Sequence, residues 1–429
     1  MAPSAQSPQG NPLPQGNSPA TERPKQSRVA GPGLDRARLI REVLAKNPSI
    51  EARRHAFRAS RARERQVDTW ADPMLGYEVA PLSIFSSNVQ FGQTIRLSQR
   101  VPWPGKLSSA RDAAEHSAAG AREAITVTEL DLALEASNLF DDYWGIERAL
   151  DVNREHRKLL DELRRGAEIQ YSVGRGSLSE PLQVDVETAM LTERDIGLEA
   201  ARDVVIARLN ALLHRRPESP LPAPSASLAI SFEAPPTAAE AQRRAIANSP
   251  ELKALAARSR AAQAEIRFAE RQYYPDLTLM ASYSSMWKEL EHQFMVGVEA
   301  PIPIQRGARG GAVDAASAKA AQVRSETTSE IDRVRAAVEI TRRRVIEALR
   351  VAKVYDQQVI PSARDQVAAV RADFGAGKVD FSNVVQAEKS LRAVELNRYR
   401  ALTELSKRRA ELSRAMGIAP GARRPGGGR

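Results

Sequence analysis

The hydrophobic positions of this chain follow first a helical and then a strand-like period. From Asp35, a residue type favoured at N-caps, to about Thr69, apolar residues recur at three- and four-residue spacing. This spacing predicts one helix of about nine turns. Pro73 ends the pattern, and apolar residues then alternate with polar ones over 74–80 and 88–99. Strict alternation indicates strands with one apolar and one polar face, so we expect a β-hairpin there.

A very long helical pattern follows the hairpin. Residues 106–171 contain no proline, and at a rise of ~1.5 Å per residue some 60 residues make a rod of roughly 90 Å. The Gly174-x-Gly176 segment should end this rod, through a positive φ that glycine tolerates. The chain should then return as a second helix over 179–213. Apolar residues with seam spacing, typical of coiled-coil packing, include Leu139, Tyr143, Ile146 and Leu150.

The same succession of patterns occurs a second time, about two hundred residues later. Pro250 repeats the setting of Pro48 at an offset of 202, and the second rod tip repeats the first at an offset of 203. We therefore predict a tandem duplication: 35–216 is the first repeat, 237–418 the second, and 217–236 a Pro-rich linker. In the second repeat we expect a helix over 237–272, strands over 276–283 and 293–300, a rod over about 312–374 and a return helix over 382–416.

The two ends of the chain differ in composition from the repeats. Residues 1–33 hold seven prolines and four glycines with few large apolar side chains. Such segments cannot offset their ordering entropy by burial, so we predict disordered tails over 1–34 and 419–429. The N-terminal segment lacks the apolar core of a secretory signal peptide. Because other features point to export, we expect the true start to lie upstream of Met1.

Overall composition limits the possible function classes. The 429 residues are 42% hydrophobic but only 5% aromatic, and no stretch approaches the roughly 18–20 apolar residues that a membrane-spanning helix needs. A helical transporter is therefore excluded. Cysteine is absent, which excludes disulfides, Cys-based zinc sites, thiol catalysis and lipidation on cysteine. A role in a membrane stays possible, because spanning strands are short and leave no hydropathy peak.

Signals of catalysis or of nucleic-acid binding are not found. The five histidines are scattered, without ligand spacing, and no phosphate loop or nucleophile elbow occurs. The segment 306–311 is similar to an RNA-binding Arg-Gly stretch, but in the repeat it takes the place of a helix start. The net charge of +10 comes from Lys and Arg interleaved with Glu and Asp along the helices. We predict no enzyme, cofactor, metal site or nucleic-acid partner.

The four amphipathic strands of one chain could cross a bilayer only together with strands from other chains. Strands of about ten residues match one crossing, and open sheet edges are not tolerated in lipid. Since the smallest transmembrane barrels have about eight strands, several chains would have to share one barrel. The residues alone leave an alternative open, in which the hairpins cover a helical bundle. The protein would then be a soluble or periplasmic coiled-coil scaffold or adaptor without channel activity.

Several motifs together resemble the TolC-like outer membrane factors, the outer membrane efflux protein family, over about 35–418. The motifs are Asn47-Pro48-Ser49-Ile50, Pro275-Asp276-Leu277, the Pro-Trp-Pro-Gly-Lys run over 102–106, and the repeated aromatic-x-x-Gly-x-x-x-apolar-x-x-x-x-Gln at the rod tips. The resemblance implies a mainly α-helical fold with a small transmembrane β part. Long helical hairpins and β-hairpins in tandem would form, in a homotrimer, a tunnel made of an α-barrel and a β-barrel.

The resemblance also implies a function and partners. The chain would be the outer membrane channel of a tripartite efflux system in a Gram-negative bacterium, with its helices in the periplasm and outer membrane lipid around its strands. It would be a passive exit duct for substrates delivered by an inner-membrane pump, of the RND type, through a periplasmic adaptor protein. The sequence does not identify the exported substrate, although the segment 102–106 is more similar to relatives that serve heavy-metal pumps than to relatives that serve drug pumps.

Residues of the two rod tips are the candidates for the working site. By resemblance, the tips meet the adaptor and close the tunnel entrance. Asn383 and Gln386 fall where the best-known relative has gate aspartates, so this chain departs from an anionic gate ring. Further gate candidates are Glu180, Gln183, Asp185 and Asp380. The candidate adaptor contacts are Tyr171, Gly174, Gly176, Leu178, Phe374, Gly377 and Phe381.

Overall fold

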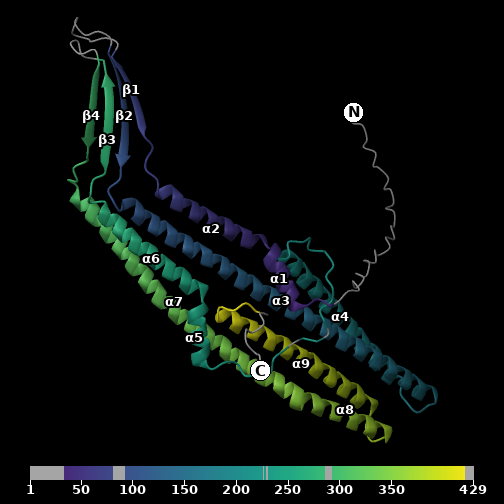
Figure 1. The fold of residues 1–429 in the computed structure, drawn as a ribbon. Helices are drawn as coiled ribbons and strands as arrows, with labels where there is room; N and C mark the ends of the chain where they lie inside the picture. Colours follow the sequence, from purple (N-terminus) through teal and green to yellow (C-terminus); the bar gives the residue numbers. More distant parts are fainter. Residues whose placement is uncertain (1–32, 81–91, 226, 229, 286–291, 421–429) are drawn as a thin grey trace, which may run out of the picture.

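The protein is an elongated layer of long helices with a small sheet at one end (Figure 1). This computed structural model describes residues 33–80, 92–225, 227–228, 230–285 and 292–420. Among these residues no helix carries the length of apolar sequence that a membrane crossing requires. Most of the expected tails lies outside the described residues. Leu34, assigned above to the N-terminal tail, instead donates its backbone N–H to the carbonyl of Ala223 at 2.9 Å.

The two halves of the chain contain the same elements in the same order. The first half has α1 (Arg36–Lys46), α2 (Pro48–Val67), β1 (Met74–Ala80), β2 (Gly92–Val101), α3 (Lys106–Ser172) and α4 (Ser179–Leu212). The second has α5 (Ala238–Asn248), α6 (Pro250–Arg271), β3 (Leu277–Ser284), β4 (Gln293–Glu299), α7 (Arg306–Val354), a π-helical turn (Tyr355–Val359), α8 (Ile360–Gly375) and α9 (Phe381–Ala415). Residues 88–91 of the expected second strand lie outside the described residues.

The expectation of one continuous helix at the start of each repeat is wrong. Asn47 has extended backbone angles (φ −71°, ψ 122°), and its side chain accepts a hydrogen bond from the N–H of Ser49. Pro48 has no N–H to continue the preceding helix, whereas its fixed φ suits the first position of a new one. Ser249 and Pro250 divide α5 from α6 in the same way. Each opening segment is therefore two helices joined by a one-residue cap.

The second rod also differs from its expected course. It begins at Arg306 rather than near residue 312, and a π-helical turn at Tyr355–Val359 interrupts it directly before Pro361. Proline removes a donor from the helical ladder, and wider turns of this kind relieve the mismatch. The first rod, α3, is continuous over 67 residues, as predicted.

The four strands form one antiparallel sheet in the order β1-β2-β3-β4. The pairing of β2 with β3 joins the two halves of the chain (Figure 1). Tyr77 lies opposite Ile95, Ile95 opposite Tyr283, and Tyr283 opposite Phe294. Because partners across a ladder share a face, the apolar positions of all four strands gather on one side of the sheet.

This apolar face of the sheet is exposed. Leu75 is 75% exposed, Phe294 79% and Val296 89%. The opposite face carries polar residues, among them Arg96, whose guanidinium lies 3.7 Å from a carboxylate oxygen of Glu78. Among the described residues, β1 and β4 pair on one side only, so both edges of the sheet are open.

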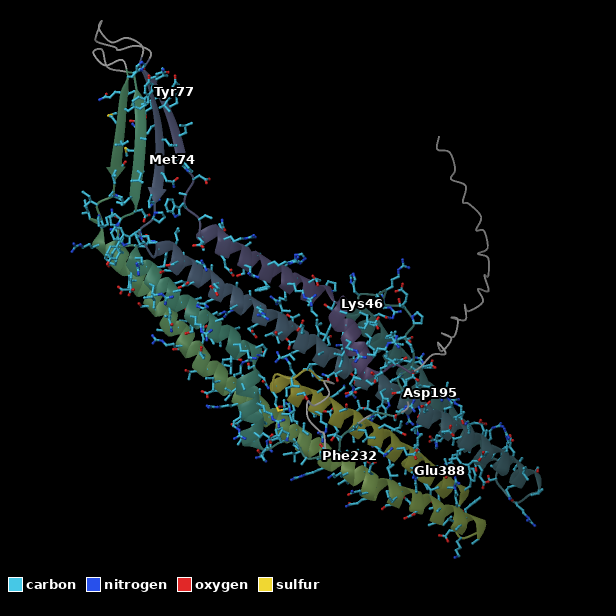
Figure 2. The ribbon with its side chains drawn as sticks, in the orientation of Figure 1. Lys46, Met74, Tyr77, Asp195, Phe232 and Glu388 are labelled. Carbon is cyan, nitrogen blue, oxygen red and sulfur yellow. The ribbon has the colours of Figure 1, made fainter. Side chains whose placement is uncertain are left out.

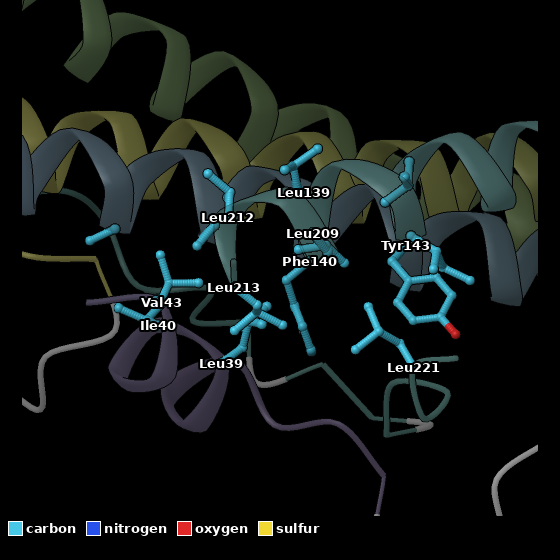
Figure 3. Packing of buried hydrophobic residues seen from close by; sticks show 14 residues of the cluster. Leu39, Ile40, Val43, Leu139, Phe140, Tyr143, Leu209, Leu212, Leu213 and Leu221 are labelled. Atoms are coloured by element: carbon cyan, nitrogen blue, oxygen red, sulfur yellow. The ribbon is translucent and has the colours of Figure 1, made fainter. Parts of the chain in front are cut away.

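Below the sheet, the helices form a layer with two long edges (Figure 1). Near the sheet the packing order is α2, α3, α6 and α7, and further down α4 and α9 lie against α3 while α8 lies against α9. The largest core cluster joins α1, α3 and α4 through Leu39, Phe140 and Leu209 (Figure 3). A second cluster joins α5, α7 and α9 around Trp144.

A polar and aromatic elbow fixes the sheet on the helices. Trp103 stacks on Tyr274 with ring centroids 5.2 Å apart. The carboxylate of Asp276 accepts hydrogen bonds from the backbone N–H of Trp103 (3.0 Å) and from Nζ of the buried Lys106 (2.7 Å). Since Trp103 and Lys106 belong to the first half and Asp276 to the second, this contact holds the two halves together where strand becomes helix.

Candidate functional site

The two rod tips lie at the end of the molecule furthest from the sheet (Figure 1). Gly174 and Gly377 both have a positive φ, 71° and 72°, as the predicted reversals require. In the first tip the N–H of Arg175 bonds the carbonyl of Gln170, and in the second the N–H of Lys378 bonds that of Asp373, both at 2.9 Å. These closing bonds are typical of glycine-terminated helices, so the tips share one backbone design.

The side chains of the two tips pack differently. In the first tip, Tyr171 and Leu178 are about half exposed. In the second, Phe374 meets Phe381 edge-on at 5.9 Å, and Phe381 is only 4% exposed. Phe381 belongs to a cluster with residues of α3 and α4, among them Leu160 and Val184. The second tip is therefore fastened to the first helical hairpin, whereas the first tip leaves its apolar residues uncovered.

A partly buried polar layer lies above the tips and joins the two helical hairpins. Lys389 of α9 donates to Glu187 of α4 at 2.6 Å. Asn153 of α3 donates to Asp195 of α4 (2.7 Å) and accepts from Arg392 of α9 (3.3 Å). Figure 2 shows Asp195 and Glu388 on the two hairpins that this layer connects. This polar layer was not predicted from the sequence, in which the charges were described only as interleaved along the helices. Charged residues at helical core spacing were the available signal.

A histidine sits within the polar layer. His156 is 8% exposed, and burial together with the charge of Arg392 lowers its pKa to about 4. The imidazole is therefore neutral near pH 7. Glu388, buried on α9 one turn before Arg392, accepts from Nε of Arg371 on α8 at 2.7 Å, so all four helices of the two hairpins contribute to the layer.

The second repeat matches the sequence model of a known protein family. The model of the outer membrane efflux protein family matches residues 242–418. The match lies within the second repeat, which is thus similar to the outer membrane efflux protein family. No curated protein sequence matches the chain significantly.

Solved structures share the fold over nearly the whole chain. The structure of CusC is 17% identical and covers 90% of this chain and 93% of its own, with a TM-score of 0.76. The outer membrane protein VceC of Vibrio cholerae is 16% identical, with 90% and 96% covered and a TM-score of 0.71. The MtrE outer membrane channel of Neisseria gonorrhoeae is 16% identical, with 90% and 89% covered and a TM-score of 0.70. The resemblance to TolC-like outer membrane factors and the mainly α-helical fold with a small antiparallel sheet are thus confirmed.

The gate candidates fall on two helix faces. Asn383 and Gln386 are exposed and share the side of α9 opposite the buried Phe381 and Val385. On α4, Gln183 is exposed on the same side as Glu187, one turn further along. These residues reach no constriction within one chain, so a ring would need further copies.

Three acidic candidates take separate positions. Asp185 points away from the Gln183 side of α4 and accepts from Nε of Arg164 on α3 at 2.7 Å. Glu180 is half-buried beside Gly176, and a Cβ added at Gly176 would lie 3.1 Å from its carboxylate. Asp380 precedes α9 with an extended backbone and makes no capping bond through its side chain. The structure therefore does not gather the acidic candidates into one cluster.

The side chains of the described residues were also compared with the ligand groups that a metal ion requires. Within the described ranges, no group of three or more His, Asp or Glu side chains is placed to hold a metal ion. The matched family is a class of efflux channels rather than of enzymes.

Proposed function

We propose that the chain is one subunit of the outer membrane channel of a tripartite efflux system, a passive exit duct. The observation that carries this proposal is the sheet, whose apolar face is exposed while its opposite face is polar. An exposed apolar face of this size on a water-soluble scaffold would promote aggregation, whereas lipid stabilises it. The alternative, a soluble coiled-coil scaffold or adaptor, leaves the sheet unexplained.

The open edges favour a closed ring of copies, and we propose a homotrimer. In lipid every backbone N–H and C=O must be bonded, so β4 of one copy would pair with β1 of the next. Three copies with four strands each exceed the minimum of about eight strands for a closed barrel. The helical layer offers matching edges, α2 and α4 on one side and α7 and α8 on the other (Figure 1). The α4 edge exposes Leu182, Val186, Met190, Ile196 and Val204.

The far end of the rods fits the entrance of the duct. We assign the exposed first tip, with Tyr171 and Leu178, to contact with a periplasmic adaptor that connects the duct to an inner-membrane pump of the RND type. Exposed apolar side chains at a rigid, glycine-terminated reversal suit such docking. Asn383, Gln386 and Gln183 would then line the constriction as amides. The helices would occupy the periplasm and the strands the outer membrane of a Gram-negative bacterium.

Extraction and mass measurement test the proposal. Expressed with an added signal peptide, the protein should enter the outer-membrane fraction and require detergent for extraction. Light scattering in detergent should then give three times the 47.0 kDa of the chain. A protein that stays soluble and monomeric without detergent would support the scaffold alternative instead.

A further inference from the structure

A small cavity lies where the start of α1, the middle of α3 and the end of α9 meet. Its volume is about 100 Å³, and Pro420 and residues 230–231 are among the residues that line it. Two guanidinium groups, from Arg36 and Arg409, and four serine hydroxyls line it; the serines are Ser137, Ser231, Ser406 and Ser413. Among the lining residues, all of which the structure describes, there is no carboxylate.

Two buried donors in the cavity wall have no partner among the described residues. Ser137 is fully buried, and its hydroxyl makes no hydrogen bond. Nε of Arg36 is likewise buried without a partner, although Nη2 of the same side chain bonds Asp141 and, at 2.8 Å, Ser406. A buried donor without an acceptor costs about 1–3 kcal/mol, so the cavity favours an occupant that accepts hydrogen bonds.

We propose that this cavity binds a small oxyanion of the phosphate or sulfate type. Two guanidinium groups and neutral hydroxyls are the donors that recognise such ions, and planar guanidinium matches their oxygens well. Ordered water is the rival occupant, since a polar cavity of this size can hold water too. Charge separates the two: water gains little from the arginines, whereas an oxyanion is stabilised by Arg409 and to a smaller extent by Arg36, whose charge is already paired with Asp141.

A bound oxyanion would connect the beginning and the end of the folded chain. Arg36 belongs to the first turn of α1 and Arg409 to the last turns of α9, while Ser137 belongs to the long rod α3. Arg409 also donates to the backbone carbonyl of Glu233 in the connection before α5. The ion would thus lock α1 and the connection against the rods halfway along the molecule, independently of whether the protein is a duct.

Calorimetry and thermal unfolding of the full-length protein in detergent test the proposal. Sodium phosphate is titrated against sodium chloride at constant ionic strength and pH 7.5, with sodium sulfate as a second oxyanion. We expect saturable binding of one ion per chain and a rise in unfolding temperature that chloride does not produce. The Ser137→Ala variant should weaken phosphate binding by about tenfold, corresponding to about 1.4 kcal/mol for one lost hydrogen bond.

The controls separate the oxyanion from water. Arg400→Gln, a change of an exposed arginine on the same helix, should leave phosphate binding unchanged. Arg409→Gln should abolish it; if that variant does not fold, Ser137→Ala alone decides. Equal unfolding temperatures in phosphate, sulfate and chloride, or unchanged phosphate binding by Ser137→Ala, would show that the cavity holds only water and would overturn the proposal.

Discussion

Lys389 of α9 donates to Glu187 of α4 across 2.6 Å, and the two residues are 202 positions apart. The offset between the two return helices is 203, so Lys389 lies one residue before the position equivalent to Glu187. Both side chains are partly buried, 33% and 15% exposed. The ion pair therefore ties the two helical hairpins together just above the tips, where relative movement of the hairpins would widen an entrance.

Reversing one charge of this pair should loosen the tips. Glu187→Lys places two ammonium groups together, and partly exposed pairs of this kind are worth roughly 1 kcal/mol or less. We expect channel conductance or open probability in planar bilayers to change by a few-fold. The double variant Glu187→Lys with Lys389→Glu should return both to the wild-type value. A double variant that behaves as the sum of its single variants would contradict a direct contact.

Phe381 should matter more than its counterpart in the first repeat. Phe381→Ala removes a buried ring from the cluster with Leu160 and Val184, at a cost of about 3–5 kcal/mol for a well-packed site. Hydrogen exchange should then speed up over 376–386. The matched control is Leu178→Ala at the equivalent position, which is 52% exposed and should shift stability by about 0.5 kcal/mol at most. Equal effects of the two variants would contradict the different packing of the tips.

A buried carboxylate makes the stability of the middle of the molecule depend on pH. Burial raises the pKa of Asp141 to about 6 from its usual 3.8, against the opposing effects of Arg36 and Ser406. The folded state therefore takes up a proton more readily than the unfolded state, and stability from this group rises as pH falls from about 6 to about 4. A shift of this size corresponds to at most about 3 kcal/mol.

The Asp141→Asn variant should lose this pH-dependent contribution to the free energy of unfolding. The urea midpoints of the wild type and of the variant are measured at pH 7.5 and at pH 5. We expect the wild-type midpoint to rise relative to the midpoint of the variant when the pH is lowered. Asp203→Asn, which changes an exposed acid of α4, is the control and should follow the wild type. Parallel pH profiles of the wild type and Asp141→Asn would show that the buried carboxyl does not titrate in this range.

The amides of the proposed constriction should limit the flow of ions. Asn383→Ala with Gln386→Ala shortens two exposed side chains on one face of α9 without touching its buried face. The expected result is a higher single-channel conductance with unchanged trimer stability. Ser382→Ala, at a neighbouring exposed position on the same helix, provides the control. Unchanged conductance of the double variant would remove these residues from the gate.

The sequence predicted the long rods and the tips because local chemistry determines them. An uninterrupted helical period predicts α3, and Gly174 and Gly377 supply the positive φ that each reversal needs. The strand faces followed from strict alternation of apolar and polar residues. By contrast, the break at Asn47 was missed: a proline also fits the first turn of a helix, so the pattern alone does not tell a kink from a new start.

Side-chain partners across helices could not be predicted in the same way. Glu187 and Lys389 each have several neighbours at helical spacing, and only the packing of α4 against α9 selects this pair. Asp185 illustrates the converse, because its position near the tip suggested the gate while the structure turns it towards Arg164. Periodicity specifies the face of one helix, whereas the contact between two helices depends on their relative rotation.

Current recording from the purified protein in a planar lipid bilayer tests most directly whether this chain forms a duct. If the chain forms a duct, the trimeric fraction should produce stepwise, long-lived increments of conductance. In that case Val296→Asp with Val298→Asp, on the apolar face of β4, should also abolish insertion, while the polar-face change Ser282→Ala should not. A trimeric, correctly folded protein that never produces conductance steps would contradict the proposed function.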